Sequence, residues 1–275
     1  APSPLRGDEN TQVEVAFQRP GEVPQTITLT RRRVTGFTPI DACVVPTTRI
    51  GYILVPTFLD PMIDDQIGAA LAQMTAPGPL DGLVFDDREN PGGSSTVALP
   101  TLGFFTSGVQ GQMVSRTTMI DLGTTANDVG GSQSVPLALL ADHDTVSFGE
   151  IFTGSLQQSG RARVVGGTTA GNVELLSAHD FSDTSRLWIA TFAFAPNGLG
   201  AGAWEGVGIV PDVTVPTRWD LFTEATDPAL AQAIGLLRNG GVRVRAARCP
   251  GCVPAAIGPQ HPVPILPELR SMPAR

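Results

Sequence analysis

Near the start of the chain, two short runs alternate apolar and polar residues. TQVEVAFQ at 11–18 and PQTITLTR at 24–31 place apolar side chains at every second position. A period of two residues puts one set of side chains on each face of a strand. Because RPGE at 19–22 has the composition of a turn, this segment is predicted to be a β-hairpin. A hairpin alone is too small to be a domain, so it either packs on the rest of the chain or is the end of a domain that begins upstream.

Further along, short apolar runs alternate with segments of helical period. Buried strands are predicted at 49–58, 81–87, 135–142 and 161–167, with helices at 64–74 and 149–160. Strand–helix–strand repeats require right-handed crossovers, which indicates an α/β core with a largely parallel sheet. A further strand or hairpin arm is predicted at 185–196, and an amphipathic helix at 227–238.

Composition indicates the size of the core and the division of the chain into segments. A chain of 275 residues with 41% hydrophobic residues can bury one sizeable core. The 31 Gly and 24 Pro residues follow no period, as in a protein with many turns. The predicted hairpin, the predicted α/β core and the Pro-rich composition after Gly241 divide the chain into four parts. These are a hairpin segment at 1–33, a linker at 34–45, a core at 46–241 and a tail at 242–275.

The charge of the chain excludes two classes of partner. The formal net charge is −8 and the isoelectric point is near 4.8, whereas nucleic acids and anionic membranes attract basic proteins. No apolar run reaches the roughly 18 residues of a membrane span. The basic run RRR at 31–33 is interpreted as a solvated strand end. All 18 basic residues are Arg, so no lysine of this chain can serve as a catalytic base.

The three cysteines do not define a metal site. Cys249 and Cys252 form a CPGC in the Pro-rich segment, and no second pair or nearby histidine completes four ligands. A disulfide or two thiols is therefore the preferred interpretation of this pair. Cys43 is far from both in the sequence, and no metal is expected.

Two strand ends carry residues suited to acyl transfer. DDRENPGGS at 86–94 follows a buried strand, and consecutive glycines let the backbone approach a ligand and offer N–H groups to an oxyanion. By itself, NPGG is also the composition of an ordinary turn. Ser147 follows the strand at 135–142, at the carboxyl edge where open α/β sheets bind ligands.

Ser147 alone has two interpretations. A serine at the start of a helix can cap it, and Glu150 three residues later would complete a capping box. Alternatively, the hydroxyl group is a nucleophile at a helix N-terminus, which favours developing negative charge. The helical pattern does not choose between these interpretations.

The order of four segments resembles that of a known family. IGYILVPTF, GLVFDDRENPGG, TVSFGEIFTGSLQQSGRARVVGGTTAGN and WEGVGIVPDVTV resemble the motif series of the C-terminal-processing (tail-specific) serine peptidases and of their tricorn-core and retinoid-binding-protein-like branches. The similarity runs from about residue 46 to residue 240 and is closer to the tricorn branch. It implies an α/β, crotonase/protease-like core of repeated β-β-α units. The first hairpin resembles the last strands of a PDZ module, most of which is expected upstream of Ala1.

The resemblance implies roles for individual residues. Ser147 takes the position of the nucleophile, and the N–H groups of Phe148 and of Gly92 or Gly93 take that of the oxyanion hole. Two residues on the family's Arg-x-Asn-x-Gly-Gly pattern are expected to shape this loop, Arg88 and Asn90.

The general base is where this sequence departs from the tail-specific branch. That branch has a lysine 25 residues after the serine, where Asn172 stands here. The tricorn-like branch uses a histidine from a segment before the PDZ module and a glutamate at the position of Glu205. The preferred base is therefore a histidine outside this chain. The remaining candidates for a base or polar partner are His179, Asn172 and Glu174, with His143 and His261 less suitably placed.

The resemblance implies a serine endopeptidase that cleaves polypeptides near their C-termini through a Ser147 acyl-enzyme. It implies no cofactor, polypeptide partners and a secreted or periplasmic location, and it leaves the oligomeric state open, a homo-oligomer included. The alternative is a catalytically impaired pseudopeptidase or peptide-binding module, because Asn172 replaces the lysine. An acyl-CoA hydrolase of related fold is a weaker alternative, since no segment resembles a CoA-binding element.

Overall fold

The computed structural model describes residues 5, 7–19, 21–33, 38–218, 221–223 and 225–240. The expected tail at 242–275, with Cys249, Cys252 and His261, lies outside the described residues. Within the described ranges, no helix has the length and apolar character needed to cross a membrane.

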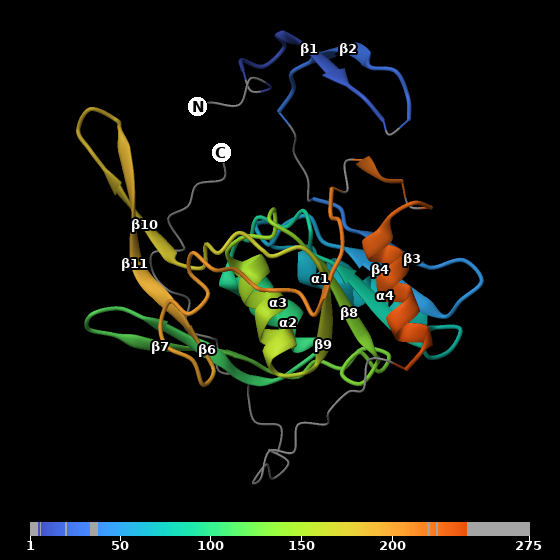
Figure 1. Ribbon diagram of the computed structural model, residues 1–275. Coiled ribbons are helices and arrows are strands. Elements are labelled where there is room, and N and C mark those ends of the chain that lie inside the picture. Colours follow the sequence, from blue (N-terminus) through green and yellow to red (C-terminus); the bar gives the residue numbers. More distant parts are fainter. Residues whose placement is uncertain are drawn as a thin grey trace.

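A six-stranded sheet lies at the centre of the molecule (Figure 1). Its strands follow the order β12 (Val213–Thr214), β9 (Ala162–Gly166), β8 (Leu137–Ala141), β5 (Gly82–Asp86), β4 (Ile50–Leu54) and β3 (Asp41–Val44). All neighbouring strands are parallel except β3, which pairs antiparallel with β4. The predicted α/β core with a largely parallel sheet is confirmed, and β3 occupies part of the segment expected to be a linker.

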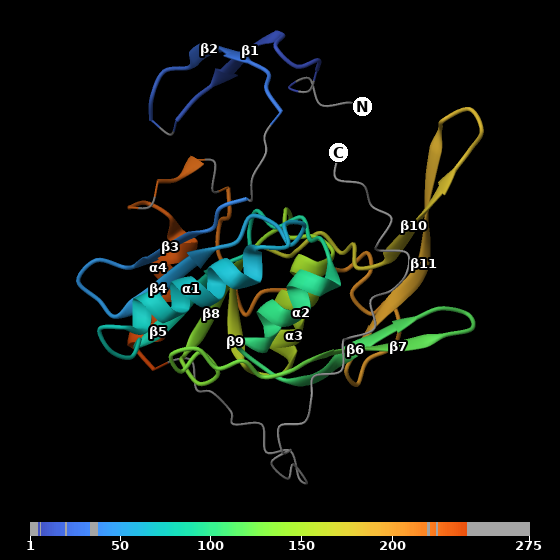
Figure 2. The same cartoon turned by 180° about the vertical axis from the view of Figure 1, so that it is seen from behind.

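Helices cover both faces of this sheet. One face packs against α1 (Ile63–Thr75), α2 (Ser95–Gly103) and α3 (Phe148–Gln158), and the other against α4 (Pro228–Arg238) (Figures 1 and 2). In β5, Leu83 and Phe85 belong to the core beneath the first three helices, whereas Val84 belongs to the core beneath α4. Burial on both faces explains why the central strands are continuous apolar runs.

A second, antiparallel sheet contains four strands in the order β10 (Leu175–Asp180), β11 (Arg186–Pro196), β6 (Gly108–Val114) and β7 (Met119–Thr124). The hairpin of β10 and β11 projects from the body in both views (Figures 1 and 2). It confirms the arm predicted at 185–196. The sequence pattern did not predict α2, β6 or β7, because Pro100 interrupts the helical signal and two glycines interrupt that of β6.

The first hairpin is also present. Strands β1 (Gln12–Phe17) and β2 (Gln25–Thr30) pair antiparallel as a separate two-stranded sheet. Every residue of β2 is exposed, including Ile27 and Leu29. Such a hairpin is only marginally stable by itself in water, so its apolar residues are suited to packing on additional strands. Its assignment to a PDZ module stays a prediction.

Candidate active site

Ser147 lies in the sharp turn that joins β8 to α3. Its backbone angles are φ 56° and ψ −122°, a region that residues with a side chain rarely occupy. Ordinary N-cap residues have extended angles, as Ser94 before α2 (φ −96°, ψ 140°) and Asp227 before α4 (φ −70°, ψ 109°) do. The turn at Ser147 has instead the strained geometry typical of a strand-to-helix nucleophile turn. The predicted capping box with Glu150 is present, and the unusual backbone angles distinguish Ser147 from a residue that is only a cap.

Glu150 holds this turn in place. Its buried carboxylate accepts hydrogen bonds from the N–H groups of Ser147 at 3.2 Å, Gly171 at 2.6 Å and Asn172 at 2.8 Å, and from the Thr169 hydroxyl at 2.5 Å. The sequence pattern identified Glu150 as a capping residue of α3. Beyond that role, its contacts tie the start of α3 to the loop at 169–172, which no local pattern revealed.

The two glycines of the NPGG segment pack directly against the serine turn. A Cβ atom on Gly92 would lie 2.7 Å from Ser147 Cβ, and one on Gly93 would lie 2.1 Å from the carbonyl carbon of Phe58. Both glycines have positive φ angles, 91° and 150°. The close approach and the backbone conformation therefore both require glycine at these positions.

The N–H groups beside the serine are not equivalent. Gly92 donates its N–H to Asn90 Oδ1 at 2.9 Å. Within the described part of the chain, the N–H groups of Gly93 and Phe148 have no hydrogen-bond acceptor. Two free donors beside a serine hydroxyl are what an oxyanion hole requires. Of the two glycines that the sequence left open, the geometry thus favours Gly93.

Asn90 contacts the glycine loop by accepting the Gly92 N–H, and a second buried side chain holds Asn90 in place. Asn90 Nδ2 donates to Asp87 Oδ1 at 2.8 Å, and Asp87 Oδ2 accepts from the Thr153 hydroxyl on α3 at 2.9 Å. Burial raises the pKa of Asp87 well above its ordinary value, against the opposing effect of these hydrogen bonds. The sequence pattern assigned no role to Asp87. The available signal was a carboxylate directly after a buried strand.

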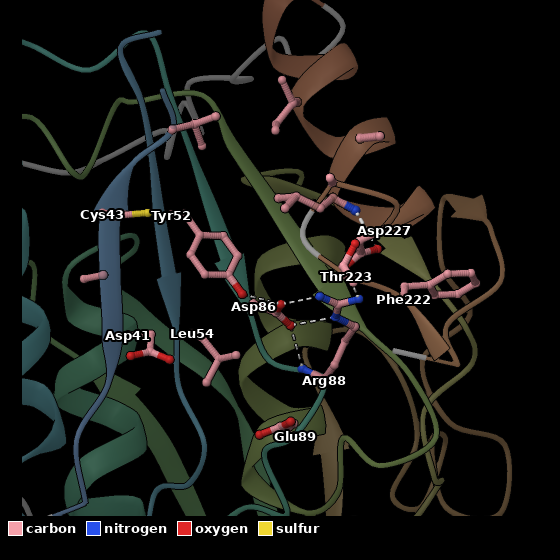
Figure 3. Close-up of a pocket in the computed structure, with 16 residues that line it drawn as sticks. Asp41, Cys43, Tyr52, Leu54, Asp86, Arg88, Glu89, Phe222, Thr223 and Asp227 are labelled. Carbon is pink, nitrogen blue, oxygen red and sulfur yellow. Dashed lines mark hydrogen bonds and ion pairs between the residues drawn. The ribbon is translucent and has the colours of Figure 1, made fainter. Parts of the chain in front are cut away.

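Arg88 has contacts other than those expected. Its Nε and Nη2 atoms donate to Asp86 at 2.9 and 2.5 Å, and its Nη1 lies 2.8 Å from Asp227 Oδ2 at the start of α4 (Figure 3). The Tyr52 hydroxyl also donates to Asp86, at 2.8 Å. These residues border a separate cavity of about 1020 Å³. Arg88 therefore links β5 to α4 rather than contacting the glycine loop.

A cleft of about 450 Å³ opens beside Ser147, Gly93 and Phe148. Most of its wall is apolar and is formed by Pro91, Met113, Val146, Ile151, Val173, Leu175, Leu176 and Trp188. Two polar side chains border the same space, Asn172 and Glu174. The cleft is suited to an apolar segment presented to the serine hydroxyl.

The structure does not bring a base to this hydroxyl. Among the described residues, no histidine or carboxylate side chain forms a hydrogen bond with Ser147 Oγ. Glu205 accepts the N–H of Val173 at 2.8 Å instead. His179 is exposed on β10 and does not border the cleft, and His143 lies 3.3 Å from Asp144 on the surface. Of the candidates, Asn172 and Glu174 are therefore the ones placed in the cleft.

Comparison with curated proteins identifies several processing proteases. The carboxyl-terminal-processing protease of Synechocystis sp. is 30% identical over 256 residues, which cover 87% of this chain and 56% of that protein. The chloroplastic carboxyl-terminal-processing peptidase 2 of Arabidopsis thaliana is 29% identical over 230 residues, 80% of this chain and 43% of that protein. The chain thus spans about half the length of the curated relatives it matches.

Solved structures share the fold. A photosystem II D1 C-terminal processing protease superposes with a TM-score of 0.60 at 22% identity, covering 82% of this chain and 62% of that one. The tricorn protease superposes with a TM-score of 0.52 at 23% identity, covering 70% of this chain and 18% of that one. The model of peptidase family S41 matches residues 49–215, and the chain belongs to this family of serine-type peptidases.

Proposed function

We propose that this protein is a serine endopeptidase that cleaves polypeptides near their C-termini, with Ser147 as the nucleophile. The observation that carries the proposal is the strained backbone of Ser147 beside the two free N–H groups of Gly93 and Phe148. Cleavage near C-termini is suggested by the names of the relatives, which are carboxyl-terminal-processing proteases. No cofactor is needed for this chemistry.

In this mechanism the Ser147 Oγ attacks the carbonyl carbon of the scissile peptide. The carbonyl oxygen becomes an oxyanion that accepts hydrogen bonds from the N–H groups of Gly93 and Phe148. Collapse of the tetrahedral intermediate breaks the C–N bond while the protonated base gives its proton to the leaving amine, and water, deprotonated by the same base, then hydrolyses the acyl-enzyme. A base must take the serine proton in the first step. We assign this role to a histidine outside this chain, with Glu205 as a partner that orients it or the substrate.

The proposal is tested with a fluorophosphonate probe, which labels activated serines covalently. The full-length protein should be labelled, and Ser147→Ala should abolish the labelling. Ser94→Ala is the matched control, because it removes a serine at a helix start with ordinary N-cap angles. Labelling that persists in the Ser147→Ala variant would exclude Ser147 as the nucleophile.

A second candidate function is a peptide-binding pseudopeptidase. It is favoured by one observation, the presence of Asn172 rather than a base in the cleft beside Ser147. This function predicts that the full-length protein binds an apolar peptide but is not labelled by the probe. Labelling and binding together would support the peptidase.

Three further assignments belong to this proposal. Residues 1–33 form the end of a PDZ module, since a hairpin with two exposed apolar residues is suited to joining further strands. Residues 46–241 form the peptidase core, and the location is secreted or periplasmic, as the family resemblance implies. The sequence of the gene upstream of Ala1 tests these assignments, which require the rest of a PDZ module and an export signal there.

A further inference from the structure

The β10–β11 arm exposes large apolar side chains to water. Leu176, Leu187, Trp188 and Ile189 are 46%, 45%, 42% and 45% exposed, respectively. Exposed apolar side chains mark an interaction site where they form a contiguous patch, so the face of the arm on which each one lies matters. The arm is therefore a candidate binding surface in addition to the cleft itself.

The two faces of the arm differ in what they adjoin. Residues directly opposite each other in an antiparallel pair share a face. One face carries an apolar strip of two opposed pairs, Leu176 with Ala190 and Ala178 with Trp188. We name this surface the cleft face, because Leu176 and Trp188 also line the cleft beside Ser147. The far face carries Leu187 and Ile189, which do not line the cleft.

The pairing of β10 with β11 changes register at the base of the arm, next to the cleft. The pairing shifts between Leu175 and Leu176, as in a β-bulge, which re-aims side chains and is common beside functional sites. Leu175 is 9% exposed, whereas Leu176 is 46% exposed. The shift thus lies where the strand changes from core packing to the open cleft face.

The far end of the cleft face is closed by an ion pair. Arg186 Nη2 donates to Asp180 Oδ2 at 2.9 Å, and the guanidinium lies 5.7 Å from the centroid of the Trp188 ring. Stacking of this kind fixes the indole ring. The four residues of the strip are apolar, and the ion pair at its far end adds no net charge.

We propose that the cleft face of the arm binds an extended, uncharged apolar segment of the polypeptide substrate, adjacent to the bond that Ser147 attacks. This inference rests on the proposed function. The strip continues the cleft without a break, since Leu176 and Trp188 belong to both. Leu176 and Ala178 lie two residues apart along β10, roughly 7 Å, so the strip accommodates about two substrate residues. Tryptophan is the residue type most enriched among those that dominate binding energy.

The test measures peptide binding in the full-length Ser147→Ala protein, so that cleavage does not interfere. The probe is a fluorescein-labelled 12-residue peptide rich in Val, Leu and Ala, compared with a Ser/Gly-rich peptide of equal length. We expect the apolar peptide to bind more tightly, and Trp188→Ala to weaken its binding about tenfold or more. Leu187→Ala is the matched control, because Leu187 is equally exposed, one residue away and on the far face.

Two outcomes would overturn the inference. One is equal affinity of the Trp188→Ala and parent proteins for the apolar peptide, and the other is an equal loss in the Leu187→Ala protein. Sedimentation of the same variants tests whether the arm instead binds a second copy of this chain. If Trp188→Ala changes the oligomeric state but not the peptide affinity, the arm is a contact between copies and the inference is wrong. Because binding is read without cleavage, failure of the proposed chemistry is detected separately by probe labelling.

Discussion

Ser147 occupies an unfavourable backbone conformation that its neighbours maintain. Such a conformation costs on the order of 1–3 kcal/mol. Each hydrogen bond to a charged group contributes roughly 1.5–3 kcal/mol, and Glu150 accepts four of them from the turn and the adjoining loop. The hydrogen bonds that Glu150 accepts are therefore large enough to offset the backbone strain at Ser147. The bonds of Glu150 thereby hold the serine turn at the edge of the cleft that Ser147 lines.

Asn172→Lys tests whether the site lacks only a base. The Asn172 side chain is exposed and borders the cleft, so an amine there stays solvated and close to Ser147. General base catalysis contributes typically 10²–10⁴-fold, and we expect fluorophosphonate labelling of Ser147 to accelerate by on the order of 10². The rate should increase with pH, because the neutral amine is the base.

Asn172→Met provides the control for this variant, since it extends the side chain without an amine. The acceleration must be absent in the Met variant. If the Lys variant is not labelled faster than the parent, the side chain at this position is not directed at the serine hydroxyl.

At the scale of elements, the site forms where two adjacent strands end. β5 and β8 are parallel neighbours, so the loop after Asp86 and the turn after Ala141 meet at one edge of the sheet. The local patterns predicted the two strands, and the family resemblance implied that the residues after them meet in one site. It did not predict that Arg88 would contact Asp227, since that contact depends on where α4 packs. Nor did it separate the roles of Gly92 and Gly93, which differ because Gly92 donates its N–H to Asn90 Oδ1.

Gly93→Ala should damage both stability and the site. The added Cβ would lie 2.1 Å from the backbone of Phe58, which forces the loop away from Ser147. We expect the variant to lose more than about 3 kcal/mol of unfolding free energy, the upper range for backbone strain alone, and to lose probe labelling. Urea denaturation measures the first effect.

Gly160→Ala separates backbone strain from steric clash. Gly160 also has a positive φ angle, 70°, but nothing lies within 4 Å of an added Cβ. We expect a loss of only about 1 kcal/mol and normal labelling. Equal losses in the two variants would contradict the close packing of Gly93.

At the scale of the whole molecule, acidic residues make stability depend on pH. Asp142 ends the strand segment before Ser147 and is buried, and burial raises its pKa to about 6, against a hydrogen bond from the Asp144 N–H. In the unfolded chain an aspartate has a pKa of about 3.9. The folded state therefore binds this proton more tightly, so the stabilising contribution is complete below about pH 4 and is lost as the pH rises through 6.

Asp142→Asn should remove this dependence. We expect the variant to be more stable than the parent at pH 7.5, by up to about 3 kcal/mol for two pKa units, and nearly equal at pH 4. Urea midpoints at both pH values measure the difference. Asp81→Asn, at an exposed position, controls for the loss of one negative charge and should show no such change. A constant difference at both pH values would indicate a packing effect instead.

The limits of sequence analysis also appear at this scale. The parallel core was predictable because its strands are continuous apolar runs with helices between them. The second sheet was predictable only for β11, whose 11 residues give a long signal. The general base could not be predicted from local patterns, because it depends on which side chain reaches the serine hydroxyl in the folded protein. Among the described residues, no histidine or carboxylate side chain forms a hydrogen bond with Ser147 Oγ.

The attachment of Asn172 to the serine turn determines what a substitution at this position can change. Asn172 is held entirely by its main chain: its N–H donates to Glu150, and its carbonyl oxygen accepts the Ser147 N–H at 3.0 Å. The side chain takes no part in this attachment. A substitution at position 172 therefore changes the group that borders the cleft without removing the main-chain bonds that hold the serine turn.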